Sequence, residues 1–288
     1  MNGILNILKP SGMTSNAVLA KVKKRFNIKR VGHLGTLDPA GVGVLPVTIG
    51  KATRLFDYFL GKDKTYLAIF TFGKTTDTLD SEGKVLFENG LVPTKGKIQG
   101  VLPKLVGKVE QIPPQFSAKN INGRRAYELA RKGEDFELKP KSVQIYSINL
   151  LEQTNENSFL FKIECSSGTY IRSICRDMAN LFNTYAYMSS IIRTTSGMFK
   201  IEDAVTLDEL LNGQIEDYLI GFETILKDFK KVNVKDEDYN KLLNGVKIEA
   251  DKKISNEEFL LYSKNELFGI ATVSDGYYKI KVNLKVND

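Results

Sequence analysis

Residues 30–46 read Arg30-Val-Gly-His33-Leu-Gly-Thr-Leu-Asp38-Pro-Ala-Gly-Val-Gly-Val-Leu-Pro46, a run of glycine and apolar residues with one carboxylate at its centre. Glycines let a backbone adopt positive φ and approach a ligand closely. Pro39 fixes its own φ and keeps Asp38 out of the α region, so the carboxylate is presented from a turn. Because an Asp-Pro pair is also an ordinary turn opener, this stretch alone leaves a purely structural role for Asp38 open.

The positive charge of the chain is concentrated beside this stretch. The first 60 residues contain nine Lys/Arg and two Asp/Glu, and the formal net charge of all 288 residues is +7. The rest of the chain is therefore balanced. A positive field beside a glycine-rich loop is typical of a protein that binds a polyanion, and nucleic acid is the obvious candidate. A solvated lysine face is the alternative.

The sequence indicates a cytoplasmic protein without metal. The N-terminus has no charged region followed by a long apolar one, as a signal peptide would. No apolar run approaches the roughly 18 residues of a membrane span. Cys165 and Cys175 make neither a metal site nor a disulfide framework, so we expect reduced thiols. Asp77, Asp80 and Glu82 share a polar loop, but their spacing is not that of a calcium-binding EF-hand.

The hydrophobic pattern predicts alternating strands and helices. Residues 64–72 alternate with period two, which predicts a strand, and Ser15 is expected to cap a helix that ends near Phe26. We expect further strands over 5–9, 44–49, 142–151, 159–166, 258–262, 267–273 and 277–286, and further helices over 51–60, 96–105, 127–132, 168–182 and 205–211.

Four motifs, in this order, resemble those of the TruB family of pseudouridine synthases. They are Leu8-Lys-Pro-Ser-Gly-Met-Thr-Ser15, Gly32-His-Leu-Gly-Thr-Leu-Asp-Pro39, Lys64-Thr-Tyr-Leu67 and Gly168-Thr-Tyr-Ile-Arg172. The resemblance covers residues 3–210 and continues more weakly to the C-terminus. Ala40-Gly-Val42 departs from the Leu-Ala-Thr that is common in relatives after the Asp-Pro pair, which alters the loop beyond Asp38 but not the acid.

This resemblance implies an α+β protein with a pseudouridine-synthase fold, built on a mixed, mostly antiparallel sheet and followed by a small C-terminal β-barrel. We expect a catalytic domain over residues 1–213, a linker region over 214–231 and a PUA-like RNA-binding domain over 232–288. Lys241-Leu-Leu-Asn-Gly-Val-Lys-Ile248 resembles the opening of a PUA domain. A plain β-extension is the alternative.

The resemblance also assigns the chemistry. Pseudouridylation detaches uracil from C1′ of its ribose, turns it and reattaches it through C5, so it needs a nucleophile but no redox change, metal or cofactor. The implied nucleophile is Asp38. Tyr66 is implied to stack on the flipped uracil and to take the C5 proton, and Arg172 to pair with Asp38. A core tyrosine and a surface arginine at a helix start are the alternatives for these two residues.

Four further residues are implied to contact the substrate. His33 matches the family histidine that supports the RNA around the vacated position, and Lys9 matches a Lys-Pro element near the site. Gly35 and Thr36 complete the expected substrate-binding set. A solvent-facing turn residue is the alternative for His33.

The implied function is conversion of the T-loop uridine of tRNA, at position 55, to pseudouridine. The expected partner is the T-arm stem-loop, and the expected protein is a monomer that needs no guide RNA and no membrane. One alternative is the guide-RNA-dependent, dyskerin-like branch, and the other is a non-catalytic RNA-binding or RNA-folding protein. The trio of Asp38, Tyr66 and Arg172 argues against the second, because binding alone needs no acid facing a polyanion.

Overall fold

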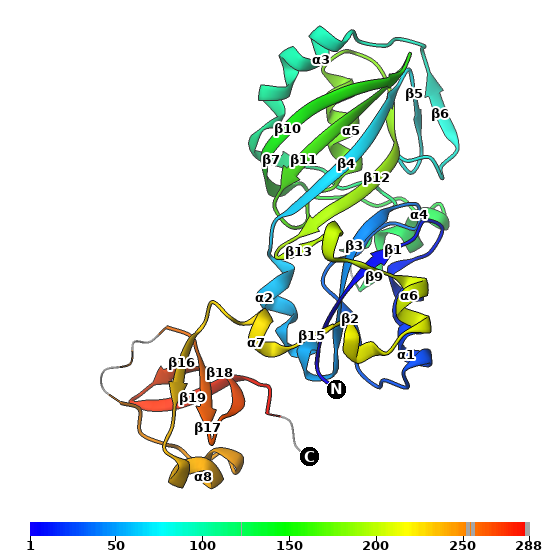
Figure 1. Ribbon diagram of the computed structural model, residues 1–288. Coiled ribbons are helices and arrows are strands. Elements are labelled where there is room, and N and C mark those ends of the chain that lie inside the picture. Colours follow the sequence, from blue (N-terminus) through cyan, green and yellow to red (C-terminus); the bar gives the residue numbers. More distant parts are fainter. Residues whose placement is uncertain (122, 252–253, 255–256, 286–288) are drawn as a thin grey trace.

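The computed structural model describes residues 1–121, 123–251, 254 and 257–285 (Figure 1). Within these residues the strands form a large mixed sheet of eleven strands, a four-stranded sheet near the C-terminus and two sheets of two strands each. The strands are β1 (Gly3–Lys9), β2 (Val31–His33), β3 (Val42–Ile49), β4 (Lys64–Phe72), β5 (Lys74–Thr76), β6 (Val85–Glu88), β7 (Gly107–Gln111), β8 (Asn120–Ile121), β9 (Arg124–Arg125), β10 (Lys141–Asn155), β11 (Ser158–Cys165), β12 (Ala186–Ser196), β13 (Phe199–Lys200), β14 (Val205–Thr206), β15 (Leu219–Ile220), β16 (Lys230–Asn233), β17 (Phe259–Ser263), β18 (Glu266–Ser274) and β19 (Tyr277–Asn283).

The helices are short and lie mostly around the large sheet (Figure 1). They are α1 (Ser15–Arg25), α2 (Phe56–Leu60), α3 (Lys95–Val101), α4 (Ala126–Arg131), α5 (Ile171–Asn180), α6 (Leu207–Asn212), α7 (Phe222–Ile225) and α8 (Tyr239–Leu243). Short 3₁₀ turns accompany them: η1 (Gly50–Leu55), η2 (Leu102–Leu105), η3 (Ile201–Asp203), η4 (Ile215–Asp217) and η5 (Asp236–Asp238).

The large sheet follows the order β14-β1-β3-β12-β4-β11-β10-β7. Strands β1 and β14 pair in parallel, as do β3 and β12, and the other neighbours along this order are antiparallel. The predicted α+β class with a mixed, mostly antiparallel sheet is therefore confirmed. The C-terminal strands form a sheet in the order β16-β17-β18-β19. Its identity as a PUA-like barrel stays a prediction.

Strand β4 lies at the centre of the large sheet, between β12 and β11. Its period-two pattern appears as buried Tyr66, Ala68 and Phe70 alternating with less buried neighbours. These side chains join a core that includes Ile174 and Met178 of α5. Because Lys64 and Tyr66 lie on the same face as this core, the strand also carries polar groups into the interior.

The cap of helix α1 differs from the expectation. Thr14, and not Ser15, caps the helix, since its hydroxyl accepts a hydrogen bond from the Ala17 amide at 3.1 Å. Ser15 is buried instead, and its Oγ both donates to the Leu37 carbonyl, at 3.0 Å, and accepts from the Leu37 amide, at 2.9 Å. Thr14 can cap because it has the extended backbone of a helix N-cap. This frees Ser15 to fix the loop that follows β2.

Several element boundaries also differ. The segment expected as a helix over 51–60 begins with the 3₁₀ turn η1 and continues as α2, and α5 ends at Asn180 rather than near Phe182. Helix α6 begins at Leu207, because Thr206 caps it reciprocally with Glu209. Strand β10 runs on to Asn155, and β19 ends at Asn283, so the expected strand end at Val286 lies outside the described residues.

The segment expected as a linker carries structure of its own. Strand β15 pairs with β1, and Ile225 and Leu226 are buried in a core shared with Leu260 and Ile270 of the C-terminal sheet. Arg54 Nη1 also donates to the Asn283 carbonyl at 2.7 Å, which ties the two sheets. Residues 214–231 therefore join the two sheets through packing as well as through the chain, and the predicted domain limits stay a prediction. Among the described residues no helix is long and apolar enough to cross a membrane.

Gly43, where β3 passes β12, should be irreplaceable. Its φ is +115°, and an added Cβ would lie 2.2 Å from the Arg193 carbonyl oxygen. We predict that Gly43→Ala lowers the free energy of unfolding by about 2–5 kcal/mol, because backbone strain and overpacking add. The matched control is Gly100→Ala in α3, where an added Cβ meets nothing within 4 Å; it should be neutral or slightly stabilising. Urea titrations of both variants make the test, and equal midpoints would contradict it.

Candidate active site

The loop between β2 and β3 is anchored at several points and presents one side chain outward. Leu34 and Leu37 are buried, the Leu34 amide donates to the Pro46 carbonyl at 3.0 Å, and the Gly41 amide donates to the Asp38 carbonyl at 3.0 Å. With Ser15 holding Leu37, the backbone on both sides of Asp38 is fixed. The carboxylate itself keeps 38% of its side-chain surface exposed.

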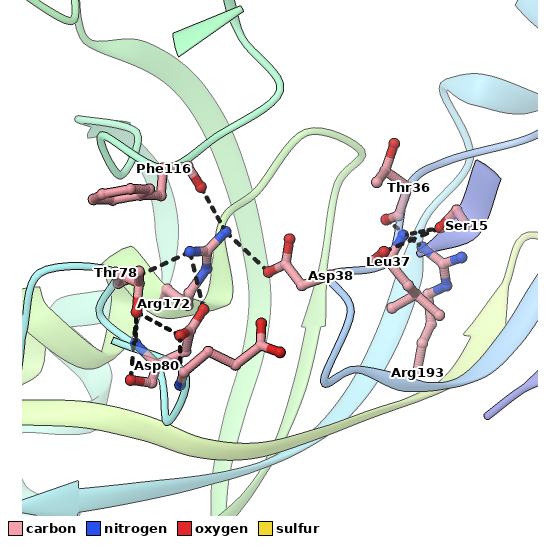
Figure 2. Close-up of polar contacts among 10 residues, drawn as sticks. Ser15, Thr36, Leu37, Asp38, Thr78, Asp80, Phe116, Arg172 and Arg193 are labelled. Atoms are coloured by element: carbon pink, nitrogen blue, oxygen red, sulfur yellow. Dashed lines mark hydrogen bonds and ion pairs between the residues drawn. The ribbon is translucent and has the colours of Figure 1, made fainter. Parts of the chain in front are cut away.

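The Asp38 carboxylate meets the guanidinium of Arg172, which projects from the first turn of α5 (Figure 2). Arg172 Nη2 lies 2.9 Å from Asp38 Oδ2, so the pair that the sequence analysis expected is present. The Arg172 side chain is only 6% exposed, and its Nη1 lies 3.1 Å from Asp80 Oδ2. Its remaining contacts are backbone carbonyls: Nη1 donates to Thr78 at 2.8 Å and Nη2 to Phe116 at 3.0 Å.

Asp80 is a site residue that sequence reasoning missed. Its sequence position, in one polar loop with Asp77 and Glu82, suggests at most a metal ligand, but its carboxylate is 8% exposed and directed at Arg172. The Glu82 amide donates to Asp80 Oδ1 at 3.1 Å, which fixes the carboxylate from behind. Asp80 and Arg172 are 92 positions apart, so no local pattern could have paired them. In the part of the chain that the structure describes, no group of three or more His, Cys, Asp or Glu side chains could hold a metal ion.

Burial and charge act in opposite directions on Asp38. Desolvation raises the pKa of the Asp38 carboxyl, and the negative charge of Asp80 raises it further. The guanidinium of Arg172 and the ammonium of Lys9 lower that pKa by favouring the carboxylate. The pKa of Asp38 thus depends mainly on how far the charge of Arg172 offsets the rise that desolvation causes.

A cavity of about 270 Å³ opens beside Asp38. Its wall contains Tyr66, which is 7% exposed, together with Arg172 and Arg193. Burial raises the pKa of the Tyr66 hydroxyl, whereas the charge and the hydrogen bonding of Arg193 lower it. The other residues that line the cavity are Gly35, Thr36, Leu37, Lys64, Ser117, Ala118, Lys119, Ser167, Gly168, Thr169, Tyr170, Ile171, Met188 and Ile191.

Arg193 is the second residue that sequence reasoning missed. It lies in β12, is 1% exposed, and its guanidinium binds the carbonyls of Gly35 and Thr36 just before Asp38. Figure 2 shows Arg172 on one side of Asp38 and Arg193 beside the loop on the other. Arg193 is followed by Thr194 and Thr195 in a strand of mixed composition, so the local sequence contained no signal that its side chain is buried.

The four expected substrate-binding residues fall into two groups. Gly35 and Thr36 line the cavity, and their carbonyls are held by Arg193. Lys9 and His33 are not among the described residues that line the cavity. Lys9 is fully buried, and its Nζ donates to the Pro10 carbonyl at 2.8 Å and to the Pro39 carbonyl at 3.1 Å. The bond to Pro39 holds the loop directly after Asp38. The burial of Lys9 lowers its pKa to about 8.

His33 is half-buried at the end of β2. Its Nδ1 accepts a hydrogen bond from the Gly35 amide at 3.4 Å, and burial, aided by the charge of Arg193, lowers its pKa. The ring is therefore neutral at pH 7 and part of the loop that carries Asp38. Its expected contact with RNA stays a prediction.

Comparison with known proteins assigns the chain to a family. Residues 23–171 match the TruB family pseudouridylate synthase (N terminal domain). The tRNA pseudouridine synthase B of Caldanaerobacter subterraneus subsp. tengcongensis is 40% identical over 278 residues, which are 96% of this chain and 96% of that protein. The enzyme of the same name from Borreliella burgdorferi is 42% identical over 266 residues, 92% of each. A solved Cbf5-Nop10-Gar1 complex contains a chain with 25% identity and a TM-score of 0.69, covering 99% of this chain and 84% of that one.

Removing the charge of Arg172 should destabilise the folded protein. We predict that Arg172→Met lowers the free energy of unfolding at pH 7 by about 3–5 kcal/mol, because it leaves the buried Asp80 carboxylate without its ionic partner. Arg176→Met, one turn along α5, is the matched control: Arg176 is half-buried and pairs with the adjacent Asp177 at 2.8 Å, so its loss should cost about 1 kcal/mol or less. Urea denaturation measures both, and equal losses would contradict the prediction that the buried contacts of Arg172 contribute more to stability than those of Arg176.

Proposed function

The chain belongs to the TruB family of pseudouridylate synthases and is a tRNA pseudouridine synthase, and from this premise we propose that it converts the uridine at position 55 of the T-loop with Asp38 as nucleophile. The observation that carries the proposal is the Asp38 carboxylate itself. It stands half-exposed at a cavity that Tyr66 also lines, 2.9 Å from a buried guanidinium. A carboxylate so placed is held by its cation yet open to a reactant on its exposed side.

The electrostatics of the cavity suit a nucleic acid. Lys64, Lys119, Arg172 and Arg193 all line it, and among the described residues that line it Asp38 is the one carboxylate. Cations in a partly enclosed site attract phosphate and stabilise negative charge that develops on a base or sugar. A site that only bound RNA would gain nothing from placing an acid among these cations. This favours a reaction on RNA over the non-catalytic alternative.

The size of the cavity suits one extruded base. At about 270 Å³, it is smaller than the roughly 300–1,000 Å³ typical of pockets for drug-sized ligands. Taking a base out of its stack costs a few kcal/mol, which stacking on an aromatic ring can offset. Tyr66 supplies such a ring, and it is in the same wall as Arg172. In the proposal Asp38 attacks either the base or C1′, and Tyr66 takes the proton from C5 once the base has been rejoined.

The C-terminal sheet is proposed to extend the RNA-binding surface as a PUA-like unit over residues 232–288. Support comes from cations and aromatic rings that lie close together in this part of the chain, such as Lys247 over Tyr277 and Lys264 over Tyr239, at 5.5 and 4.7 Å from Nζ to the ring centroid. Surfaces that bind single-stranded nucleic acid combine cations along the backbone with aromatic rings on which bases stack. A monomer that works in the cytoplasm on the T-arm of tRNA, without cofactor or metal, completes the proposal.

The test is release of tritium from a T-arm stem-loop that carries 5-tritiated uridine at position 55, incubated with this protein alone. The reaction moves the glycosidic bond to C5 and so expels the hydrogen of C5. The proposal expects stoichiometric release without added RNA, protein or metal. Activity that appears only with a guide RNA would favour the dyskerin-like alternative, and tight binding without release would favour a non-catalytic RNA-binding protein.

Asp38→Asn should abolish this release while leaving affinity for the stem-loop nearly unchanged. The amide keeps the size of the side chain but cannot act as an anionic nucleophile. Asp57→Asn is the matched control, because it makes the same change of charge on an exposed residue of α2. Single-turnover tritium release and filter binding measure the two effects. Turnover by Asp38→Asn at the rate of Asp57→Asn would remove Asp38 from the mechanism.

A further inference from the structure

Arg193 lies beside both segments that carry the proposed catalytic side chains, Tyr66 and Asp38. In the sheet it pairs with Tyr66 on β4 and with Gly43 on β3, so it is flanked by the strand that carries Tyr66 and by the strand that leaves the Asp38 loop. It is among the largest of the fully buried side chains, at 1% exposure. A cation buried to this degree is stable only if its N–H groups have acceptors.

Three of its N–H groups have backbone acceptors. Nε donates to the Val44 carbonyl at 2.7 Å, Nη1 to the Thr36 carbonyl at 3.3 Å, and Nη2 to the Gly35 carbonyl at 3.1 Å. A guanidinium has five N–H groups. One N–H of Nη1 and one of Nη2 therefore remain, on the two atoms that bind the Asp38 loop, and Arg193 is one of the residues that line the cavity.

The Tyr66 hydroxyl is within the influence of this guanidinium. Both residues line the cavity beside Asp38, and the charge and hydrogen bonding of Arg193 lower the pKa of Tyr66 against the effect of burial. The nearby charge of Asp38 raises the same pKa. Among the groups that act on this hydroxyl, Arg193 is thus the one that favours its deprotonated form.

We propose that Arg193 is a positioning residue for the last proton transfer of the reaction: its two remaining N–H groups hold the Tyr66 oxygen as a base. Of the other three, two hold the Asp38 loop at Gly35 and Thr36, and Nε holds β3 at Val44. This role rests on the proposed function. One buried side chain then fixes the position of Asp38, which begins the reaction, relative to Tyr66, which completes it.

The step balances without oxidant or reductant. Once C5 has bonded to C1′, C5 carries that bond and its hydrogen, and N1 is doubly bonded to C6. The Tyr66 phenolate takes the hydrogen as a proton, the C–H electron pair forms the C5–C6 double bond, and the C6–N1 π pair moves to N1, which takes a proton from solvent. The N–H groups of Arg193 stabilise the phenolate that this step requires.

The experiment compares single-turnover rates for the stem-loop with hydrogen or deuterium at C5 of the target uridine. In Arg193→Lys one nitrogen replaces the fork and cannot hold both the loop and the phenol. The rate of pseudouridine formation should fall about 10- to 100-fold, the range expected for a charge-assisted hydrogen bond. A deuterium effect should appear because C5 deprotonation becomes limiting, and the alkaline part of the pH–rate profile should move to higher pH. Arg25→Lys, which alters an exposed arginine bound to the Leu211 carbonyl, should leave all three unchanged.

A double variant distinguishes an effect of Arg193 on the Tyr66 oxygen from a purely structural effect. In a Tyr66→Phe background, Arg193→Lys should cost the C5 step nothing further, because the oxygen on which it acts is gone. The same fractional loss in both backgrounds, without a deuterium effect, would overturn the proposal and make Arg193 purely structural. If the wild-type protein forms no pseudouridine at all, the proposed function fails, which is a different result.

A second measurement needs no Arg193 variant. In side-chain ¹⁵N spectra of the folded protein, Tyr66→Phe should shift the Nη signals of the buried Arg193 guanidinium but leave its Nε signal, which reports the bond to Val44. Unchanged Nη signals would equally overturn the proposal.

Discussion

One guanidinium shared between two carboxylates organises this molecule. Arg172 is buried, and an arginine in that position needs acceptors for its N–H groups and charges to offset its own. Asp38, Asp80 and the carbonyls of Thr78 and Phe116 supply them. These acceptors come from three separate segments, and the arginine comes from α5. The interaction therefore fixes the relative positions of four parts of the chain that are distant in sequence. Asp38 and Arg172 also line the cavity beside this cluster.

The sheet provides the second half of the same arrangement. The parallel contact of β3 with β12 is so close at Gly43 that only glycine fits there, and it puts Arg193 directly beside the loop that carries Asp38. Lys9 and Ser15 fix that loop from the other side. Asp38 consequently projects from a loop whose backbone is held by side chains on three strands or helices. Rigid support of this kind keeps a reactive group in place without using the group itself.

The sequence indicated those features that depend on local pattern or on an ordered set of motifs. The alternation of residues 64–72 identified the central strand, and the motif resemblance supplied the Asp38–Arg172 pair that the structure contains. It could not identify Asp80 as the second partner of Arg172, because that contact depends on how a polar loop folds against α5. Nor could it tell that Ser15 holds the loop that carries Asp38 while Thr14 caps the helix, since Ser and Thr are both favoured as caps. Arg193 was hidden for a related reason: its partners are backbone carbonyls, which leave no trace in sequence.

The charges around Arg172 act on the pKa of the Asp38 carboxyl, the proposed nucleophile. The most direct measurement is the acid part of the pH–rate profile for single-turnover tritium release, compared between the wild type and Asp80→Asn. Asp80 raises the pKa of Asp38, so removing its charge should lower that pKa, and the rate should persist to lower pH. An acid limb that stays in place, or moves to higher pH, in a folded Asp80→Asn protein would contradict the account.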